Sequence, residues 1–200
     1  MRFVVPLLLA LILVSPASAV PLQDLLVPGA ELDAGRLQFT DFQLVSSTGI
    51  SAGSINVQPL AVGGLAFPAL DVPHAVTQAY EISFLASADA GINAFSFAVD
   101  RLQEIADGVA IVRAVTAGVQ ISLPVFTSSP PFFPISLHAS SQIPPASSVP
   151  VFIRAAAIGG ESFPPNGPPA QVFISNPTIT FAVPEPGSAW IGGRGLRYSC

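Results

Sequence analysis

The chain has 200 residues, of which 50% are hydrophobic and 10% are charged, and its formal net charge at pH 7 is -5. All 7 basic residues are arginines, too few and too scattered to neutralise a run of phosphates or hold an anionic membrane surface. This composition excludes a nucleic-acid-binding protein. The single cysteine, Cys200, excludes an intrachain disulfide and a metal site built from several thiolates.

The first 19 residues have the organisation of a secretory signal peptide. Arg2 precedes an apolar run over residues 3–14, and the small residues Ala17 and Ala19 mark a cleavage site. The run is shorter than the roughly 18–20 apolar residues that cross a bilayer, so we expect no stable membrane anchor. The alternative is a buried N-terminal strand or helix. We predict that signal peptidase cleaves after Ala19, and that the protein is exported to the periplasm, the outer surface or the extracellular space.

The next part of the chain consists of short segments in which apolar and polar residues alternate. Such alternation is typical of half-buried strands, and segments rich in Gly, Pro, Ser and Asn separate them as turns. In the segment 36–46 the phase changes between Phe39 and Phe42, which predicts a bulge or bend. One stretch, 101–109, has some helical character, which Gly108 ends. The predicted strands are 36–46, 54–60, 79–87, 94–100, 108–116, 119–126, 133–140, 149–159, 171–175 and 178–183.

This pattern predicts an all-β fold. Nine or ten short strands with turns between them indicate an antiparallel β-sandwich of jelly-roll type, forming a single domain over residues 20–182. Most of the 21 prolines fall in the predicted turns or at strand ends, where a missing N–H group does no harm. Residues 183–200 form a tail beyond the domain.

One motif suggests hydrolytic chemistry. GISAG at 49–53 matches Gly-x-Ser-x-Gly, and Ser51 is followed along the chain by Asp107 and His138, in the order of an α/β-hydrolase triad. That motif works on a sharp turn from a strand into a helix, and the segment after Ser51 reads as a strand instead. We therefore interpret GISAG as a loop or hairpin and reject the hydrolase.

Other candidates for chemistry are sparse. His74 and His138 are the two histidines, and neither stands in a metal-binding spacing. The carboxylates are too scattered to nominate an acid/base pair. We expect no catalytic residue, no cofactor and no metal, and hence no enzyme. The aromatic pair in PFFP, at 131–134, is a candidate binding surface on a loop.

The tail begins with a recognisable motif. The sequence TFAVPEPGSAW at 180–190 resembles the start of the PEP-CTERM sorting signal of exported proteins in Gram-negative bacteria, and the matching residues are Val183, Pro184, Glu185, Pro186 and Gly187. The resemblance implies recognition by the membrane enzyme exosortase and a link to exopolysaccharide and biofilm. The two prolines of the motif, Pro184 and Pro186, keep Glu185 extended and prevent the preceding strand from continuing.

The tail then departs from that family. An apolar helix should follow Trp190, but the chain continues IGGRGLRYSC, which is too short and too charged to span a membrane. The sorting signal is therefore expected to be truncated, and exosortase processing to fail. We also expect residues 187–200 to be disordered, and Cys200 to form some intermolecular disulfide.

Three classes of function remain open from the sequence. The first is a non-enzymatic exported protein of the cell envelope or extracellular matrix, linked to exopolysaccharide. The second is a carbohydrate-binding β-sandwich, which would need two or more exposed aromatic side chains on one sheet face. The third is an enzyme, which would need a polar cluster that the sequence does not reveal.

Overall fold

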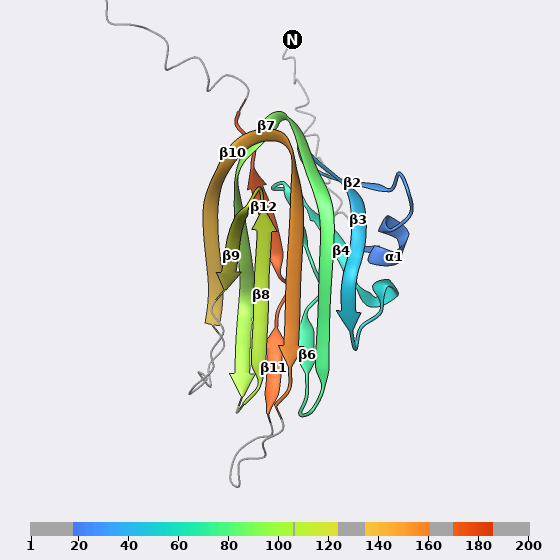
Figure 1. Cartoon of the computed structure of the whole chain (residues 1–200), viewed down its shortest axis with the longest axis vertical. Coiled ribbons are helices and arrows are strands. Elements are labelled where there is room, and N and C mark those ends of the chain that lie inside the picture. The colour runs from blue at the N-terminus through green and yellow to red at the C-terminus, as the bar shows by residue number, and fades with distance from the viewer. Residues whose placement is uncertain (1–17, 106, 124–134, 161–169, 186–200) are drawn as a thin grey trace, which may run out of the picture.

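The protein is described by a computed structural model that covers residues 18–105, 107–123, 135–160 and 170–185. Within these ranges almost every regular element is a strand, and the exceptions are the helix α1 (Leu22–Leu25) and the 3-10 helix η1 (Ala52–Ser54) (Figure 1). The strands are β1 (Val20–Pro21), β2 (Glu31–Ala34), β3 (Leu37–Thr48), β4 (Asn56–Leu60), β5 (Gly64–Ala66), β6 (Leu70–Val72), β7 (Thr77–Ile105), β8 (Val109–Thr116), β9 (Val119–Leu123), β10 (Ile135–Ile158), β11 (Gln171–Ile174) and β12 (Thr178–Ala182).

Two long strands organise the molecule. β7 has 29 residues and β10 has 24, and they pair antiparallel along almost their whole length. Both strands curve over at the upper end of the molecule in Figure 1 and return downwards. The register shifts at this bend: residues 88–91 of β7 lie opposite Ser147, and residues 143–145 of β10 lie opposite Asn93. Bulges of this kind are what turn a strand from one sheet into another.

The sequence explains why the bend lies there. Gly91 has a φ of 80°, a conformation that costs a residue with a side chain but not glycine. Pro144 and Pro145 have no N–H group to contribute to a ladder, so a bulge suits them better than a regular strand. The turns predicted between 87 and 94 and between 140 and 149 are therefore bends inside continuous strands.

The bend divides the strands into two layers. The first sheet runs in the order β2, β3, β7 (residues 77–87), β10 (residues 148–158), β8 and β9. In the second sheet, β10 (residues 135–146) pairs with one edge of β7 (residues 92–105), and β12 and β11 pair with the other edge. Beyond β12 the order continues with β5, β4 and β1, and beyond β11 it continues with β6. The prediction of an all-β antiparallel sandwich is confirmed.

Aromatic side chains fill the space between the two sheets. Phe39 of β3 contacts Phe84 of β7 at a ring-centroid distance of 5.8 Å and reaches across to Phe181 of β12 at 6.1 Å. Phe42 stacks on Phe84 at 5.3 Å, and Phe67 lies 6.2 Å from the same ring. All five rings are at least 95% buried, and each such burial contributes roughly 1.5–3 kcal/mol. These five phenylalanines therefore serve the core, as their strand spacing indicates.

The predicted bulge in the segment 36–46 is confirmed. The register of β3 against β7 shifts between Thr40 and Gln43, and Asp41 between them has a φ of 55°. The additional residue explains why Phe39 and Phe42, three positions apart, are both buried on the same side of the sheet.

The helical character predicted for 101–109 is wrong. Residues 101–105 continue β7, where Leu102 and Glu104 point inwards and their neighbours point outwards. The inward Glu104 accepts a hydrogen bond from the backbone N–H of Ala110 at 2.8 Å. Pairing with β11 decided the conformation, because tertiary context overrides a weak local helix propensity.

Candidate functional site

A hollow of about 260 Å³ lies on the outer face of the second sheet, where β6, β11 and β7 are neighbours. Gln103, Phe173 and Asp71 lie directly opposite one another on these three strands and form a row across the sheet. We call this feature the Arg101 hollow. Its lining consists of Asp71, Arg101, Gln103, Ile105, Gln171 and Phe173.

Contacts among the lining residues hold the Arg101 hollow in shape. The Arg101 guanidinium carbon lies 5.0 Å from the centroid of the Phe173 ring, and Arg101 Nη2 donates a hydrogen bond to Gln103 Oε1 at 2.9 Å. Gln171 Nε2 donates to Asp71 Oδ1 at 3.0 Å. The backbone N–H of Arg101 is bonded to Ser175 Oγ at 2.7 Å. Every lining side chain except that of Ile105 is therefore oriented by a neighbour before any ligand arrives.

The chemistry of the Arg101 hollow suits a polyhydroxylated ligand. A half-buried ring and a guanidinium provide flat surface, while a carboxylate and two amides provide hydrogen-bond acceptors and donors close together. Sugars present the same combination, with apolar C–H faces beside hydroxyl groups that both donate and accept. Arg101 and Asp71 are exposed, so the charged groups lie where a ligand can reach them.

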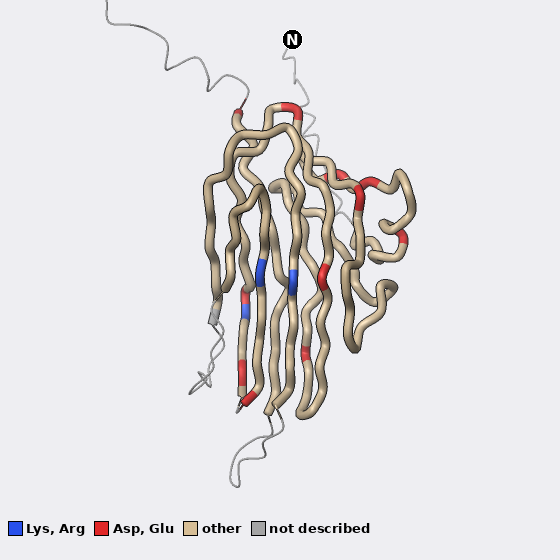
Figure 2. The backbone as a smooth tube through the Cα atoms, viewed as in Figure 1, with Lys and Arg blue, Asp and Glu red and all other residues tan. Residues whose placement is uncertain are grey.

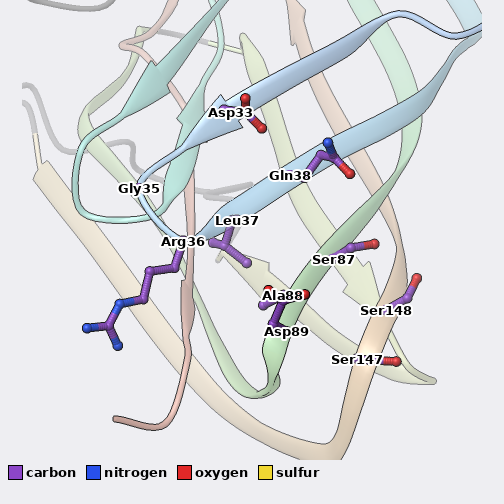
Figure 3. A pocket seen from close by; sticks show the side chains of 10 residues that line it. All are labelled: Asp33, Gly35, Arg36, Leu37, Gln38, Ser87, Ala88, Asp89, Ser147 and Ser148. Carbon is purple, nitrogen blue, oxygen red and sulfur yellow. The ribbon is translucent and has the colours of Figure 1, made fainter. Parts of the chain in front are cut away.

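A second, larger depression of about 610 Å³ lies at the bend end of the first sheet. Asp33, Gln38, Ser87 and Ser148 are directly opposite one another on β2, β3, β7 and β10, and Figure 3 shows them along one side of the depression. Arg36 points away from that row. The lining contains no aromatic ring, and its polar groups are hydroxyls, an amide, carboxylates and the guanidinium of Arg36. It gives a ligand no flat surface to pack against.

The residues of the rejected triad lie on separate elements. Ser51 precedes η1, and its hydroxyl is 3.0 Å from the hydroxyl of Ser54. Asp107 lies between β7 and β8, and His138 is exposed on β10 opposite Ala98. The segment after Ser51 passes through a 3-10 turn into β4, so the strand-to-helix turn that a nucleophilic serine needs is not formed there.

The other predicted candidates are placed as follows. His74 is half-buried in the turn between β6 and β7. Among the described residues there is no group of three or more His, Cys, Asp or Glu side chains that could hold a metal ion. The PFFP segment at 131–134 and Cys200 lie outside the described residues.

The two ends of the predicted domain are partly described. Ala19 is exposed just before β1, whereas Ala17 lies outside the described residues. At the other end β12 finishes at Ala182, after which Val183 and Pro184 are half-buried and Glu185 is exposed. Pro186 lies outside the described residues. No helix in the described part of the chain is long and apolar enough to cross a membrane.

Sequence reasoning did not bring the residues of the Arg101 hollow together. Alternation over 101–105 and 171–174 could have placed Arg101, Gln103 and Phe173 on an outer face. The pairing of β7 with β11 joins residues about 70 positions apart in the chain, and a single sequence does not reveal such a pairing.

Comparisons with known proteins give a structural match alone. No family model matches the chain, and no curated protein matches it. One solved structure matched by shape is TmCBM61 in complex with β-1,4-galactotriose, with 8% sequence identity and a TM-score of 0.34 over 70% of this chain and 88% of that chain. At this level of likeness the function has to be argued from the site itself.

Proposed function

We propose that the chain is an exported, non-enzymatic β-sandwich protein of the cell envelope or extracellular matrix that binds polysaccharide. The observation that supports this proposal is the Arg101 hollow. It joins an aromatic ring, a guanidinium, a carboxylate and two amides on the surface of a chain with 10% charged residues. Binding sites for small ligands commonly combine apolar surface with a few such convergent polar groups.

A sugar would bind by stacking and by paired hydrogen bonds. One C–H face of the sugar would pack beside Phe173, and neighbouring hydroxyls would donate to Asp71 and accept from Arg101. The described residues do not meet the criterion of two exposed aromatics on one face, because Phe152 and Phe173 are half-buried on different sheets. A single ring gives little buried area, so we expect weak binding that gains strength from repeated units of a polymer.

Substitutions in the Arg101 hollow test the binding proposal. We expect Phe173→Ala and Arg101→Ala each to weaken retention in gels containing neutral polysaccharides by about tenfold or more, because each removes part of the contact surface. Gln43→Ala, on the exposed edge of the first sheet, is the matched control and should bind as the wild type does. Equal retention of Phe173→Ala and wild type would rule out this site.

Export is tested at the N-terminus. The residues Ala17 and Ala19 predict that exported material begins at Val20 or within a few residues of it. N-terminal sequencing of periplasmic and secreted fractions measures this directly. An intact Met1 on exported protein would contradict the proposal.

We also propose that the tail motif is accessible on the folded protein, although the truncated signal is expected to escape processing. Glu185 is exposed three residues after the last strand ends, so an enzyme that reads the motif would not have to unfold the sandwich. Exosortase remains the enzyme implied by the resemblance of Val183, Pro184, Glu185 and Pro186 to the PEP-CTERM signal.

A further inference from the structure

A polar row crosses the outer face of the first sheet, on the other layer from the Arg101 hollow. Its five members lie directly opposite one another on β3, β7, β10, β8 and β9, and Figure 2 shows its charged members as two neighbouring blue bands beside a red one. We call it the arginine row. In strand order it consists of Ser46, Glu81, Arg154, Arg113 and Ser122.

The charges in the arginine row do not balance. Glu81 Oε1 lies 3.3 Å from Arg154 Nε, and Glu81 Oε2 accepts a hydrogen bond from Ser46 Oγ at 2.9 Å. The ion pair with Arg154 does not have hydrogen-bond geometry. Arg113 instead lies over the Phe152 ring, with its guanidinium carbon 5.7 Å from the ring centroid. Among the described residues no carboxylate forms an ion pair with Arg113.

This arrangement leaves an incompletely compensated positive charge on the sheet. Like charges directly opposite each other on neighbouring strands repel, and one carboxylate compensates one of the two arginines. Arg113 is half-buried, and its Nε is buried without a hydrogen-bond acceptor in the described part of the chain. An anion bound beside the guanidinium of Arg113 would supply the compensating negative charge.

The surroundings restrict what that anion can be. The rows on either side of the arginine row over β10, β8 and β9 carry no charge, and their members are Phe152, Val115 and Gln120 on one side and Ala156 and Ile111 on the other. Gln120 Nε2 donates to Ser122 Oγ at 2.7 Å at the edge of the sheet. The face thus combines a half-exposed ring, hydroxyl and amide groups, and two arginines whose Cβ atoms are expected about 5 Å apart.

We propose that this face binds an acidic polysaccharide, with the carboxylate of a uronic acid unit at Arg113 and Arg154 and the sugar ring beside Phe152. A guanidinium matches the two oxygens of a carboxylate with parallel hydrogen bonds. The inference rests on the proposed function in taking a polysaccharide as the carrier of the anion. It concerns a separate surface, on the opposite sheet from the Arg101 hollow.

The test measures binding of the purified full-length chain to sodium alginate. We expect Arg113→Gln to weaken alginate binding by about tenfold, because it removes a charged hydrogen-bonding partner. Arg113→Lys should fall between Gln and wild type, since lysine keeps the charge but not the planar fork. Arg36→Gln removes the same charge at the bend end and is the matched control, expected to bind as wild type does. Rising NaCl should weaken the binding of the wild type.

Additional measurements distinguish acidic-polysaccharide binding at the arginine row from unfolding of the variants, from general attraction to carboxylates, and from binding at the Arg101 hollow. Far-UV circular dichroism and thermal unfolding of each variant confirm that the sandwich is intact. Polyglutamate should bind more weakly than alginate, because it offers carboxylates without a sugar ring, and equal binding would overturn the polysaccharide assignment. Unchanged alginate binding in Arg113→Gln, or none in the wild type, would overturn the site. Neutral polysaccharides with the Phe173→Ala variant test the Arg101 hollow independently, so the two proposals can fail separately.

Discussion

Tyr80 is a residue whose ionisation is strongly affected by the fold. Its side chain is fully buried between the sheets, and its hydroxyl donates a 3.3 Å hydrogen bond to the carbonyl oxygen of Pro68. Burial disfavours the charged phenolate and raises the pKa of Tyr80 well above its ordinary value of 10.0. The folded protein therefore holds this proton at a pH where the unfolded chain releases it.

This shift predicts a loss of stability in alkali. Because the folded pKa is raised, the contribution of Tyr80 is complete below the unfolded pKa and declines as pH rises above about 10, by about 1.4 kcal/mol per pH unit. Urea unfolding at pH 8 to 11 measures the free energy. Tyr80→Phe should lose about 1 kcal/mol at pH 8 with its hydrogen bond, and should show a flatter decline above pH 10. If the free energies of unfolding of the wild type and of Tyr80→Phe declined in parallel above pH 10, the decline would not come from Tyr80.

At the scale of elements, we expect the close approach of neighbouring strands to limit the replacement of glycines more than backbone conformation does. Gly64 opens β5, and a Cβ there would meet backbone atoms of Ile179 and Thr180 on β12, with Thr180 Cα at 2.9 Å. Gly118, in the turn between β8 and β9, has a φ of 78° but open space around it. A glycine is therefore required for different reasons at the two positions: close approach of a neighbouring strand at Gly64, and a left-handed backbone conformation at Gly118.

Alanine at each position should therefore have a different cost. We expect Gly64→Ala to lower the free energy of unfolding by about 3 kcal/mol, because two paired strands must separate. Gly118→Ala should cost about 1 kcal/mol, for the left-handed conformation alone. Chemical denaturation of both variants measures the difference. A Gly118→Ala variant less stable than Gly64→Ala would show that strain, not crowding, dominates.

Element prediction from the sequence succeeded where alternation was long enough to read. The strand at 108–116 agrees with β8, and residues 119–123 of the predicted strand 119–126 form β9 after a two-residue turn, while 124–126 lie outside the described residues. β2, β5 and β6 were missed, because segments of three or four residues carry too little alternation to identify. The residues 88–91 and 143–145 were read as turns, since glycine and proline favour bends and turns alike.

Prediction of a candidate site was limited for a different reason. The row of Gln103, Phe173 and Asp71 depends on the pairing of β7, β11 and β6, and the arginine row depends on five strands. Local pattern can place each side chain on an outer face but does not say which strands are neighbours. The fold class could therefore be read from the sequence, whereas both surfaces required the structure.

At the scale of the whole molecule, the two sheets share their central strands. β7 and β10 pass from one layer into the other, and hydrogen bonding continues through the bend, so the 12 strands form one folded-over sheet. A sheet that lost its pairing on one side of the bend would leave the apolar face of the other side uncovered. Neither layer has a core of its own.

The shared strands predict a single cooperative unfolding transition. Hydrogen exchange of amides in β8, in the first sheet, and in β12, in the second, should report the same free energy of opening under conditions where global unfolding dominates. Both should also match the value from chemical denaturation. Two separate values, one for each sheet, would show that the layers unfold independently.

The same two strands also set the order in which the sandwich can be assembled. β3 can pair with β7 as soon as residue 87 is available, but β10 supplies the partner of β7 in both layers, and its pairing spans residues 77 to 158. Until that late segment arrives, β7 presents unpaired N–H and C=O groups on either side of the bend. Contacts so distant along the chain form slowly. The other edge of β7 in the second sheet is then paired by β11 and β12. A chain that emerges N-terminus first would therefore expose unpaired strand edges, and would benefit from a holding chaperone, until residue 182 has emerged.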